Sequence, residues 1–154
     1  MKILMVCLGN ICRSPMADGL LRKKVAELDL DVIVDSAGTS GIHAGEMPDH
    51  RMRETAKSLG VNIDILRARQ FRVSDFDEFD LIYAMDKANA ANILALARTD
   101  ADKQKVDLIL NLLEPGKDHE VPDPYYGGNQ GFVDVFKMLD AATDKIIEKI
   151  NTND

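Results

Sequence analysis

Cys7 and Arg13 lie close together near the N-terminus, with five residues between them, and as a pair they could bind and attack an anion. A thiol with an ordinary pKa of ~8.5 is only about 3% ionised at pH 7. A nucleophilic thiolate at that pH needs a pKa lowered by about 2–3 units, which corresponds to roughly 3–4 kcal/mol. A helix dipole supplies ~0.3–1 kcal/mol, and about 2 kcal/mol at most. Hydrogen bonds to the sulfur must supply the rest, and Ser14 and the neighbouring backbone amides are the candidate donors.

The residues around this pair predict a strand, a tight loop and a helix. The apolar run Ile3–Val6 predicts a strand buried on both faces. Gly9 and Asn10 follow in the turn, and both tolerate left-handed backbone angles. Ser14 and Pro15 are typical of a helix start, with a hydroxyl cap before a proline at the first helical position. Backbone N–H groups of the loop and the first helical turn, which have no internal partners, would then converge on an anion.

Arg13 makes phosphate the expected anion, because a guanidinium presents parallel donors that match two phosphate oxygens. A nucleophilic thiolate beneath a bound phosphoryl group indicates a phosphatase site. The alternative is a buried structural cysteine beside a helix cap, but here the strand, the glycine turn, the Arg-Ser pair and the helix start are all in register. We predict that the phosphate-binding loop comprises Leu8, Gly9, Asn10, Ile11, Cys12, Arg13 and Ser14.

The stretch Val6–Pro15 resembles the signature loop of the low-molecular-weight protein tyrosine phosphatases. Further motifs follow in the order that this family shows, namely Asp35–Thr39, Ala68–Gln70, Met85–Asp86 and Asp123–Tyr126. The resemblance covers nearly the whole chain. It implies an enzyme that hydrolyses phosphotyrosine and small aryl phosphates through a phosphocysteine intermediate, releases inorganic phosphate and needs no cofactor.

The resemblance also implies a role for each site residue. Cys7 is the nucleophile, and Arg13 binds the phosphate and stabilises its transition state. Asp123 protonates the leaving phenol and then activates water against the phosphocysteine. Tyr125 and Tyr126 line the mouth of the cleft, where an aromatic wall would stack on the phosphotyrosine ring. Without the resemblance, the Asp-Pro pair would be interpreted as a turn opener, and the two tyrosines as packing for a long loop.

A redox role for Cys7 and Cys12 is also implied by the resemblance, because the family uses the second cysteine as a reversible disulfide partner against over-oxidation. The alternative is that Cys12 is a small buried apolar residue. Asp86 and Ser36 match family positions too, and we interpret them as support for the loop geometry rather than as reacting groups.

Two positions depart from better-known members of the family, and they leave substrate preference open. Leu66 stands where many members carry a histidine, and Ile42 where many carry an aromatic residue at the cleft rim. Five arginines also form a locally basic zone, which is either a solvated face or a surface that steers acidic phosphopeptides. These are Arg51, Arg53, Arg67, Arg69 and Arg72.

Length and composition predict a single domain spanning residues 1–154. The net charge is 19 − 26 = −7, which argues against nucleic acid or an anionic membrane as a partner. No apolar run approaches the ~18 residues of a membrane span, and the N-terminus lacks the pattern of a signal peptide. Two cysteines in one short loop fit a reducing cytoplasm. We expect a cytoplasmic monomer or weak dimer with phosphotyrosine-containing proteins as partners.

Strand and helix patterns alternate along the chain. Strands are predicted at residues 3–6, 32–34, 81–84 and 106–110, and helices at 16–28, 48–59, 87–98 and 132–150. A short helix is expected near Ser74, and the loop 38–48 should lie beside the phosphate loop because both follow strand ends. The predicted fold class is α/β: a single-domain, three-layer, Rossmann-like or flavodoxin-like fold, with helices on both faces of a four-stranded parallel sheet. Cys7 then lies at the carboxyl end of a strand, where ligands bind in such folds.

Three rival functions remain open. An arsenate reductase shares this fold and loop, but its chemistry relays oxidation through later cysteines, and none follows Cys12. Phosphoarginine hydrolysis is the second rival, in which relatives carry threonine at the position of Ile11. A non-catalytic phosphotyrosine-binding or thiol-switch protein is the third, although a mere binder needs no Asp123. A metal site is not expected, because His43, His50 and His119 show no ligand spacing.

Overall fold

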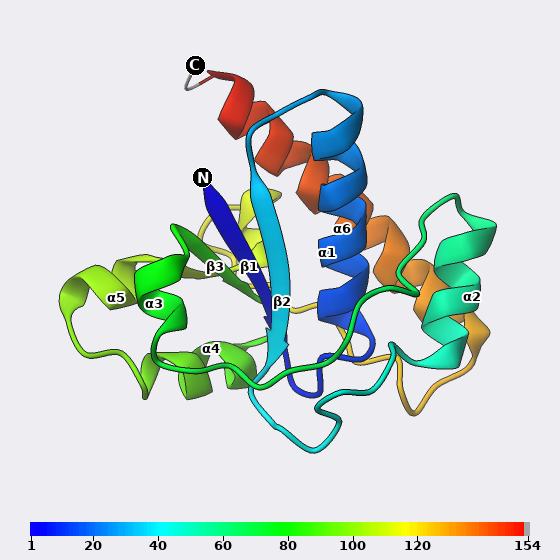
Figure 1. Cartoon of the computed structure of the whole chain (residues 1–154), viewed down its shortest axis with the longest axis horizontal. Coiled ribbons are helices and arrows are strands. Elements are labelled where there is room, and N and C mark those ends of the chain that lie inside the picture. Colours follow the sequence, from blue (N-terminus) through cyan, green and yellow to red (C-terminus); the bar gives the residue numbers. More distant parts are fainter. Residues whose placement is uncertain (153–154) are drawn as a thin grey trace.

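The computed structural model describes residues 1–152, and its centre is a four-stranded parallel sheet with strand order β2-β1-β3-β4 (Figure 1). β1 pairs with a strand on each side, and its residues 3–6 are fully buried, as the apolar run predicts. The predicted α/β fold class with a four-stranded parallel sheet is confirmed. The strands are β1 (Lys2–Cys7), β2 (Ile33–Gly38), β3 (Leu81–Ala84) and β4 (Val106–Leu108).

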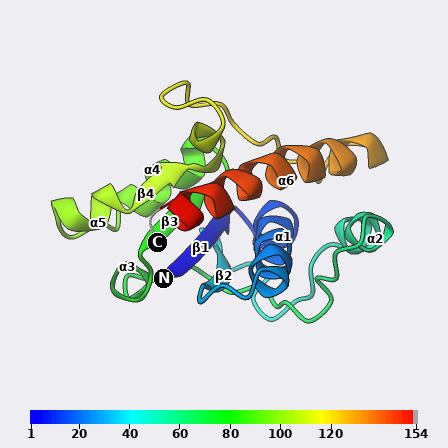
Figure 2. The same cartoon turned by 90° about the horizontal axis from the view of Figure 1, so that it is seen from above.

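Helices cover both faces of the sheet, and successive residues of β1 point into opposite layers. Ile3, Met5 and Cys7 pack in one apolar cluster with residues of α1, α2 and α6. Leu4 and Val6 pack in a second cluster with residues of α3 and α4. Figure 2 shows α1 and α6 on one side of the sheet and α3 on the other. The helices are α1 (Arg13–Glu27), α2 (His50–Ser58), α3 (Asp75–Glu78), α4 (Lys87–Leu94), α5 (Asp100–Gln104), a 3-10 turn (Ile109–Leu112) and α6 (Asn129–Thr152).

The start of α1 differs from the prediction. The helix begins at Arg13 with Cys12 at the N-cap position, so the prediction that Ser14 caps it is wrong. The Ser14 hydroxyl lies instead 3.0 Å from the sulfur of Cys7. Pro15 is the third residue of the helix, where it is tolerated because first-turn N–H groups have no intrahelical acceptor. Arg13 therefore belongs to the helix rather than to the loop.

Several other boundaries also differ. The helix predicted at residues 87–98 ends at Leu94 as α4. The next helix, α5, was not predicted; it begins after Thr99, whose hydroxyl caps it by accepting the N–H of Asp102. The strand predicted at 106–110 ends at Leu108 and continues as a 3-10 turn. β2 is longer than predicted and runs on to Gly38. α2 ends within one residue of the predicted end at 59, and Gly60 follows it with a φ of +87°.

Candidate active site

The loop between β1 and α1 turns sharply at Asn10, whose φ of +56° places it in the left-handed region. The segment after β2 lies along this loop, as predicted. Thr39 donates its N–H to the carbonyl of Cys7 over 2.9 Å, and Asp49 donates its N–H to the carbonyl of Ile11 over 2.7 Å. Two loops that follow neighbouring parallel strands therefore support one another at the carboxyl edge of the sheet.

The sulfur of Cys7 lies at the centre of this loop. The Asn10 N–H donates to it over 3.3 Å, and the Ser14 hydroxyl oxygen lies 3.0 Å from it. The same hydroxyl donates to the side-chain oxygen of Asn10 over 2.7 Å. Ser14 and Asn10 are both buried, so the polar groups that surround the sulfur are fixed by the fold.

Arg13 is the first residue of α1, and its side chain is only 3% exposed. Its Nη1 donates to the carboxylate of Asp86 over 2.7 Å and to the carbonyl of Val121 over 2.9 Å. Its Nη2 lies 3.7 Å from the carboxylate of Asp123. Asp86 in turn caps α4 by accepting the N–H of Asn89. Groups from distant parts of the chain thus hold the guanidinium in one orientation.

Asp123 lies across the cleft from the phosphate loop, on the segment before α6. Its carboxylate accepts the N–H of Tyr125 over 3.0 Å. The cleft has a volume of about 170 Å³, and its wall brings together most of the residues singled out in the sequence. The lining residues are Cys7, Leu8, Gly9, Ile11, Cys12, Arg13, His43, Asp123, Tyr125 and Tyr126. Asn10 and Ser14 are the two predicted site residues outside this wall, and they support the loop from behind.

A sequence model described as "Low molecular weight phosphotyrosine protein phosphatase" matches residues 2–154. The chain belongs to this family. The low molecular weight phosphotyrosine protein phosphatase of Schizosaccharomyces pombe is 42% identical over 141 residues, which are 90% of this chain and 89% of the relative.

Solved structures agree with this assignment. A protein tyrosine phosphatase from Entamoeba histolytica, with Hepes in its active site, has a TM-score of 0.92 at 41% identity, covering 99% of this chain and 98% of that one. DARP, a Drosophila arginine phosphatase, has a TM-score of 0.91 at 30% identity and covers 100% of both chains.

The two tyrosines of this phosphatase differ in exposure. Tyr125 is 38% exposed, whereas Tyr126 is 91% exposed. Their rings meet edge to face, with centroids 5.0 Å apart. Tyr125 is the inner part of the wall, and the Tyr126 ring is free to contact a bound molecule at the mouth.

Sequence reasoning named His43 only as a rejected metal ligand and Arg51 only as part of a basic zone, and it connected neither with the cleft. His43 lines the cleft and its Nδ1 lies 2.7 Å from a carboxylate oxygen of Glu46. Arg51 donates to the carbonyl of Tyr125 over 2.8 Å. The predicted contact between loop 38–48 and the phosphate loop could have drawn attention to His43. No signal in the sequence connects Arg51 with Tyr125.

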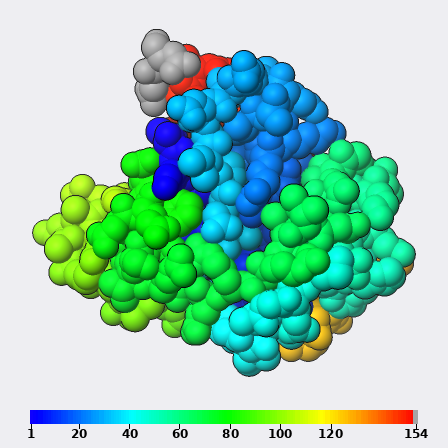
Figure 3. Space-filling view, viewed as in Figure 1, coloured from blue at the N-terminus to red at the C-terminus, as the bar shows by residue number. Residues whose placement is uncertain are grey.

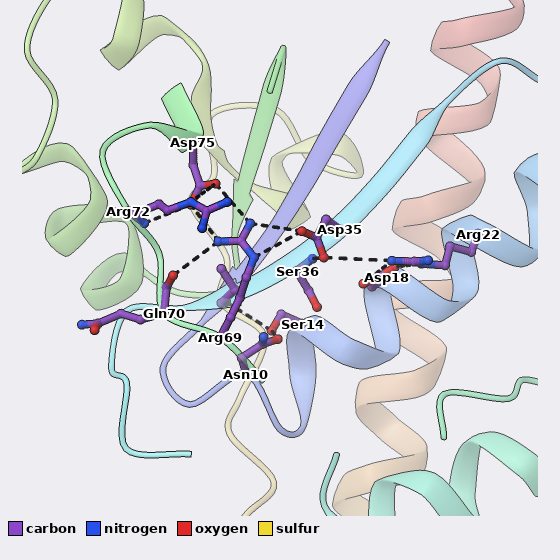
Figure 4. Close-up of polar contacts among 11 residues, drawn as sticks. Asn10, Ser14, Asp18, Arg22, Asp35, Ser36, Arg69, Gln70, Arg72 and Asp75 are labelled. Carbon is purple, nitrogen blue, oxygen red and sulfur yellow. Dashed lines mark hydrogen bonds and ion pairs between the residues drawn. The ribbon is translucent and has the colours of Figure 1, made fainter. Parts of the chain in front are cut away.

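Two arginines of the basic zone predicted from the sequence pair with different carboxylates. Arg69 lies between two carboxylates, Asp35 and Asp75, each 3.1 Å from its guanidinium, and its backbone carbonyl accepts the N–H of Gly38 (Figure 4). Arg51 instead pairs with Asp49 on the cleft side of the molecule. Arg69 and Arg51 are therefore each held by local acidic partners.

A second part of this polar network lies on α1. Asp18 is fully buried and accepts a hydrogen bond from Nε of Arg22. Burial raises the pKa of the Asp18 carboxyl, and the hydrogen bonds from Arg22 oppose that rise. Ser36, on β2, lies near Asp18 (Figure 4) and is not among the residues that line the cleft.

Cys12 and Leu66 both belong to the apolar interior. Cys12 is 4% exposed, and burial raises the pKa of its thiol, with nearby negative charge at Asp49 acting in the same direction. Both cysteines are free thiols. Leu66 packs against the core. In the phosphate loop, the buried Nδ2 of Asn10 has no hydrogen-bond partner among residues 1–152.

Within residues 1–152 the structure contains no cluster of three or more histidine, cysteine or acidic side chains placed to hold a metal ion. In the same range, none of the helices combines the length and apolar character needed to cross a bilayer.

Proposed function

We propose that this chain hydrolyses phosphotyrosine in proteins, with Cys7 as the nucleophile, Arg13 as the phosphate-binding group and Asp123 as the general acid and base. The observation that carries the proposal is that these three side chains line one cleft of about 170 Å³. Membership of the low molecular weight phosphotyrosine protein phosphatase family supports the same reaction.

Phosphate binding would use the loop from Leu8 to Ser14. Its backbone N–H groups and the first turn of α1 provide donors for a phosphoryl dianion. The fork of Arg13, already fixed by Asp86 and Val121, offers its remaining donors to two phosphate oxygens. Charge that develops on these oxygens during the reaction is stabilised by groups that need no reorganisation.

The first chemical step forms the sulfur–phosphorus bond and breaks the bond from phosphorus to the phenolic oxygen. The N–H of Asn10 stabilises negative charge on the Cys7 sulfur. Ser14 carries one hydroxyl proton, which it can donate to the side-chain oxygen of Asn10 or, over 3.0 Å, to the sulfur. Donation to the sulfur favours the thiolate that attacks. Asp123 gives its proton to the departing phenolate oxygen.

The second step hydrolyses the phosphocysteine. Asp123, now a carboxylate, takes a proton from the attacking water, the sulfur–phosphorus bond breaks, and inorganic phosphate and the Cys7 thiolate are regenerated. Protein groups and water alone supply the atoms and protons that these two steps require. Tyr125 and Tyr126 provide an aromatic wall for the ring of the substrate tyrosine.

Hydrolysis of an aryl phosphate without added metal tests this proposal. Cys7→Ser is expected to abolish activity, and Asp123→Asn to depress it by ~10²–10⁴-fold, which is the usual contribution of general acid–base catalysis. Unchanged activity in either variant would refute the assigned role. Reduction of arsenate in place of phosphate ester hydrolysis would reject the reaction itself.

Phosphoarginine is the second candidate substrate, because the Drosophila arginine phosphatase matches this chain with a TM-score of 0.91. The bulk of Ile11 and the tyrosine pair at the mouth favour a planar phenolic ester over a long guanidinium side chain. Rates on phosphotyrosine and phosphoarginine peptides of one sequence separate the two candidates. A marked preference for phosphoarginine would reverse our choice.

We also propose that residues 1–154 act as one domain, as a monomer or weak dimer in the cytoplasm, and that Cys12 forms a reversible disulfide with oxidised Cys7. Cys7 and Cys12 both line one small cleft, which supports the redox role. Sedimentation of the purified chain tests the assembly state.

A further inference from the structure

Arg51, near the start of α2, touches the segment that carries Asp123. Its Nη2 donates to the backbone carbonyl of Tyr125 over 2.8 Å. Its guanidinium carbon lies 5.4 Å from the centroid of the Tyr125 ring and 4.7 Å from that of Phe132 in α6. Cations at these distances from aromatic faces are attracted to them. One side chain thus joins α2, the segment before α6, and α6 itself.

Asp49 fixes the direction of the Arg51 side chain. Its two carboxylate oxygens accept from Nε and Nη2 of Arg51, each over 3.2 Å. Asp49 also caps α2 and donates its own N–H to the carbonyl of Ile11 in the phosphate loop over 2.7 Å. The Asp49–Arg51 pair therefore spans the distance between the phosphate loop and the segment that faces it.

The segment 122–128 has few other attachments. Two of its other hydrogen bonds are internal, from the N–H of Gly127 to the carbonyl of Pro124 and from the N–H of Tyr125 to the carboxylate of Asp123, and the carbonyl of Gly128 accepts the N–H of Gly131 in α6. Among residues 1–152, the Arg51 hydrogen bond and the 3.7 Å ion pair of Asp123 with Arg13 join this segment to parts of the chain other than the adjoining α6. In Figure 3 the loop after β2, in cyan, and the orange segment before α6 meet at the lower edge of the molecule.

We propose that Arg51 is a positioning residue, which holds the Asp123 carboxyl over the cleft by clamping the carbonyl and ring of Tyr125. The link is short, because the same Tyr125 gives its N–H to Asp123. The inference rests on the proposed function, in which Asp123 protonates the leaving oxygen. Arg51 itself does not line the cleft and touches no reacting atom.

The dependence of kcat/KM on the leaving group is the measurement that a purely structural role of Arg51 would leave unchanged. A phenolate such as tyrosine, with a pKa of ~10, needs a proton from Asp123 to depart, whereas dinitrophenolate departs without one. We expect Arg51→Met to lower kcat/KM about 10–100-fold for a phosphotyrosine peptide and less than about 3-fold for 2,4-dinitrophenyl phosphate. Arg53→Met is the matched control, because Arg53 lies on the same helix and bonds the carbonyl of Pro48 instead. It should change neither rate.

Arg51→Lys covers the case in which the methionine variant does not fold. A lysine keeps the charge beside the rings but cannot bond Tyr125 and both Asp49 oxygens together. We expect an intermediate loss of about 3–10-fold on the phosphotyrosine peptide alone. Equal losses on both substrates, or no loss on the peptide, would overturn the inference.

The double variant with Asp123→Asn completes the test. If Arg51 acts through Asp123, Arg51→Met adds little to the loss that Asp123→Asn already causes on the phosphotyrosine peptide. A further loss of the same factor as in the wild-type background would overturn the inference. A loss by Asp123→Asn alone that is equal on both substrates would instead overturn the acid role in the proposed function, so the two failures are distinguishable.

Discussion

Asp86→Asn removes the negative charge nearest to the buried Arg13 guanidinium while leaving an acceptor for the N-terminus of α4. Asparagine caps helices about as well as aspartate, so the bond from Asn89 survives. Arg13 is 3% exposed, and water cannot replace the lost partner at 2.7 Å. A hydrogen bond between charged groups contributes about 1.5–3 kcal/mol.

The carbonyl of Val121 and the more distant Asp123 continue to compensate the Arg13 charge. We therefore expect a loss of about 2 kcal/mol in the free energy of unfolding. For a chain of this size that lowers Tm by roughly 4–8 °C. Asp86→Ala, which also removes the cap of α4, should lose about 1 kcal/mol more.

Thermal unfolding in phosphate-free buffer measures these losses, since bound phosphate would replace the missing negative charge. The matched double variant is Asp86→Asn with Arg13→Met, which removes both charges. It should be more stable than the sum of the single losses predicts, by about 1–2 kcal/mol, because no unpaired buried charge is left. Strict additivity, or an unchanged Tm in Asp86→Asn, would refute the view that Asp86 holds Arg13 in place.

Three further predictions concern the thiols and a surface ion-pair cluster. Near neutral pH, iodoacetamide should add to Cys7 alone, since burial raises the pKa of Cys12. Intact mass should show one adduct in the wild type and none in Cys7→Ser. A second adduct formed at the same rate would contradict the prediction. Peroxide should inactivate the wild type reversibly, with activity restored by thiol, whereas Cys12→Ser should recover poorly. Equal recovery of the two proteins would rule out a protective role for Cys12. Hydrogen bonds from Arg98 lower the pKa values of Asp77 and Asp102 below the ordinary 3.8. Because the pKa values of Asp77 and Asp102 are lowered in the folded state, these carboxylates stabilise the protein above about pH 4, and the stabilisation is lost as pH falls through the lowered values. The difference in Tm between wild type and Arg98→Met should therefore shrink below about pH 4. An advantage that stays constant down to pH 2 would argue against this linkage.

Local sequence predicted the parts of the fold whose contacts are local. The strand at 81–84 was located to the residue, and the central strand, the left-handed turn at Asn10 and the stop at Gly60 were found as well. In each case the signal lies within a few residues, as an apolar run or a residue that tolerates positive φ. The helix predicted at 87–98 stops early at Leu94, and α5 was not predicted because its start is set by the capping bond from Asp102 to Thr99, which hydrophobic periodicity does not report.

The site divides in the same way. Cys7 and Arg13 could be placed together at the carboxyl end of a strand from their positions in the chain, because one turn joins them. The groups that hold them are known only from the folded protein, since the partners of Arg13 come from 73 and 108 positions away and the Tyr125 carbonyl that Arg51 bonds from 74 positions away. Such contacts depend on strand order and on how the loops pack at the sheet edge. Charge and hydrogen-bonding capacity are visible in a sequence, but the pairing of two such groups is set by the packing of the elements that carry them.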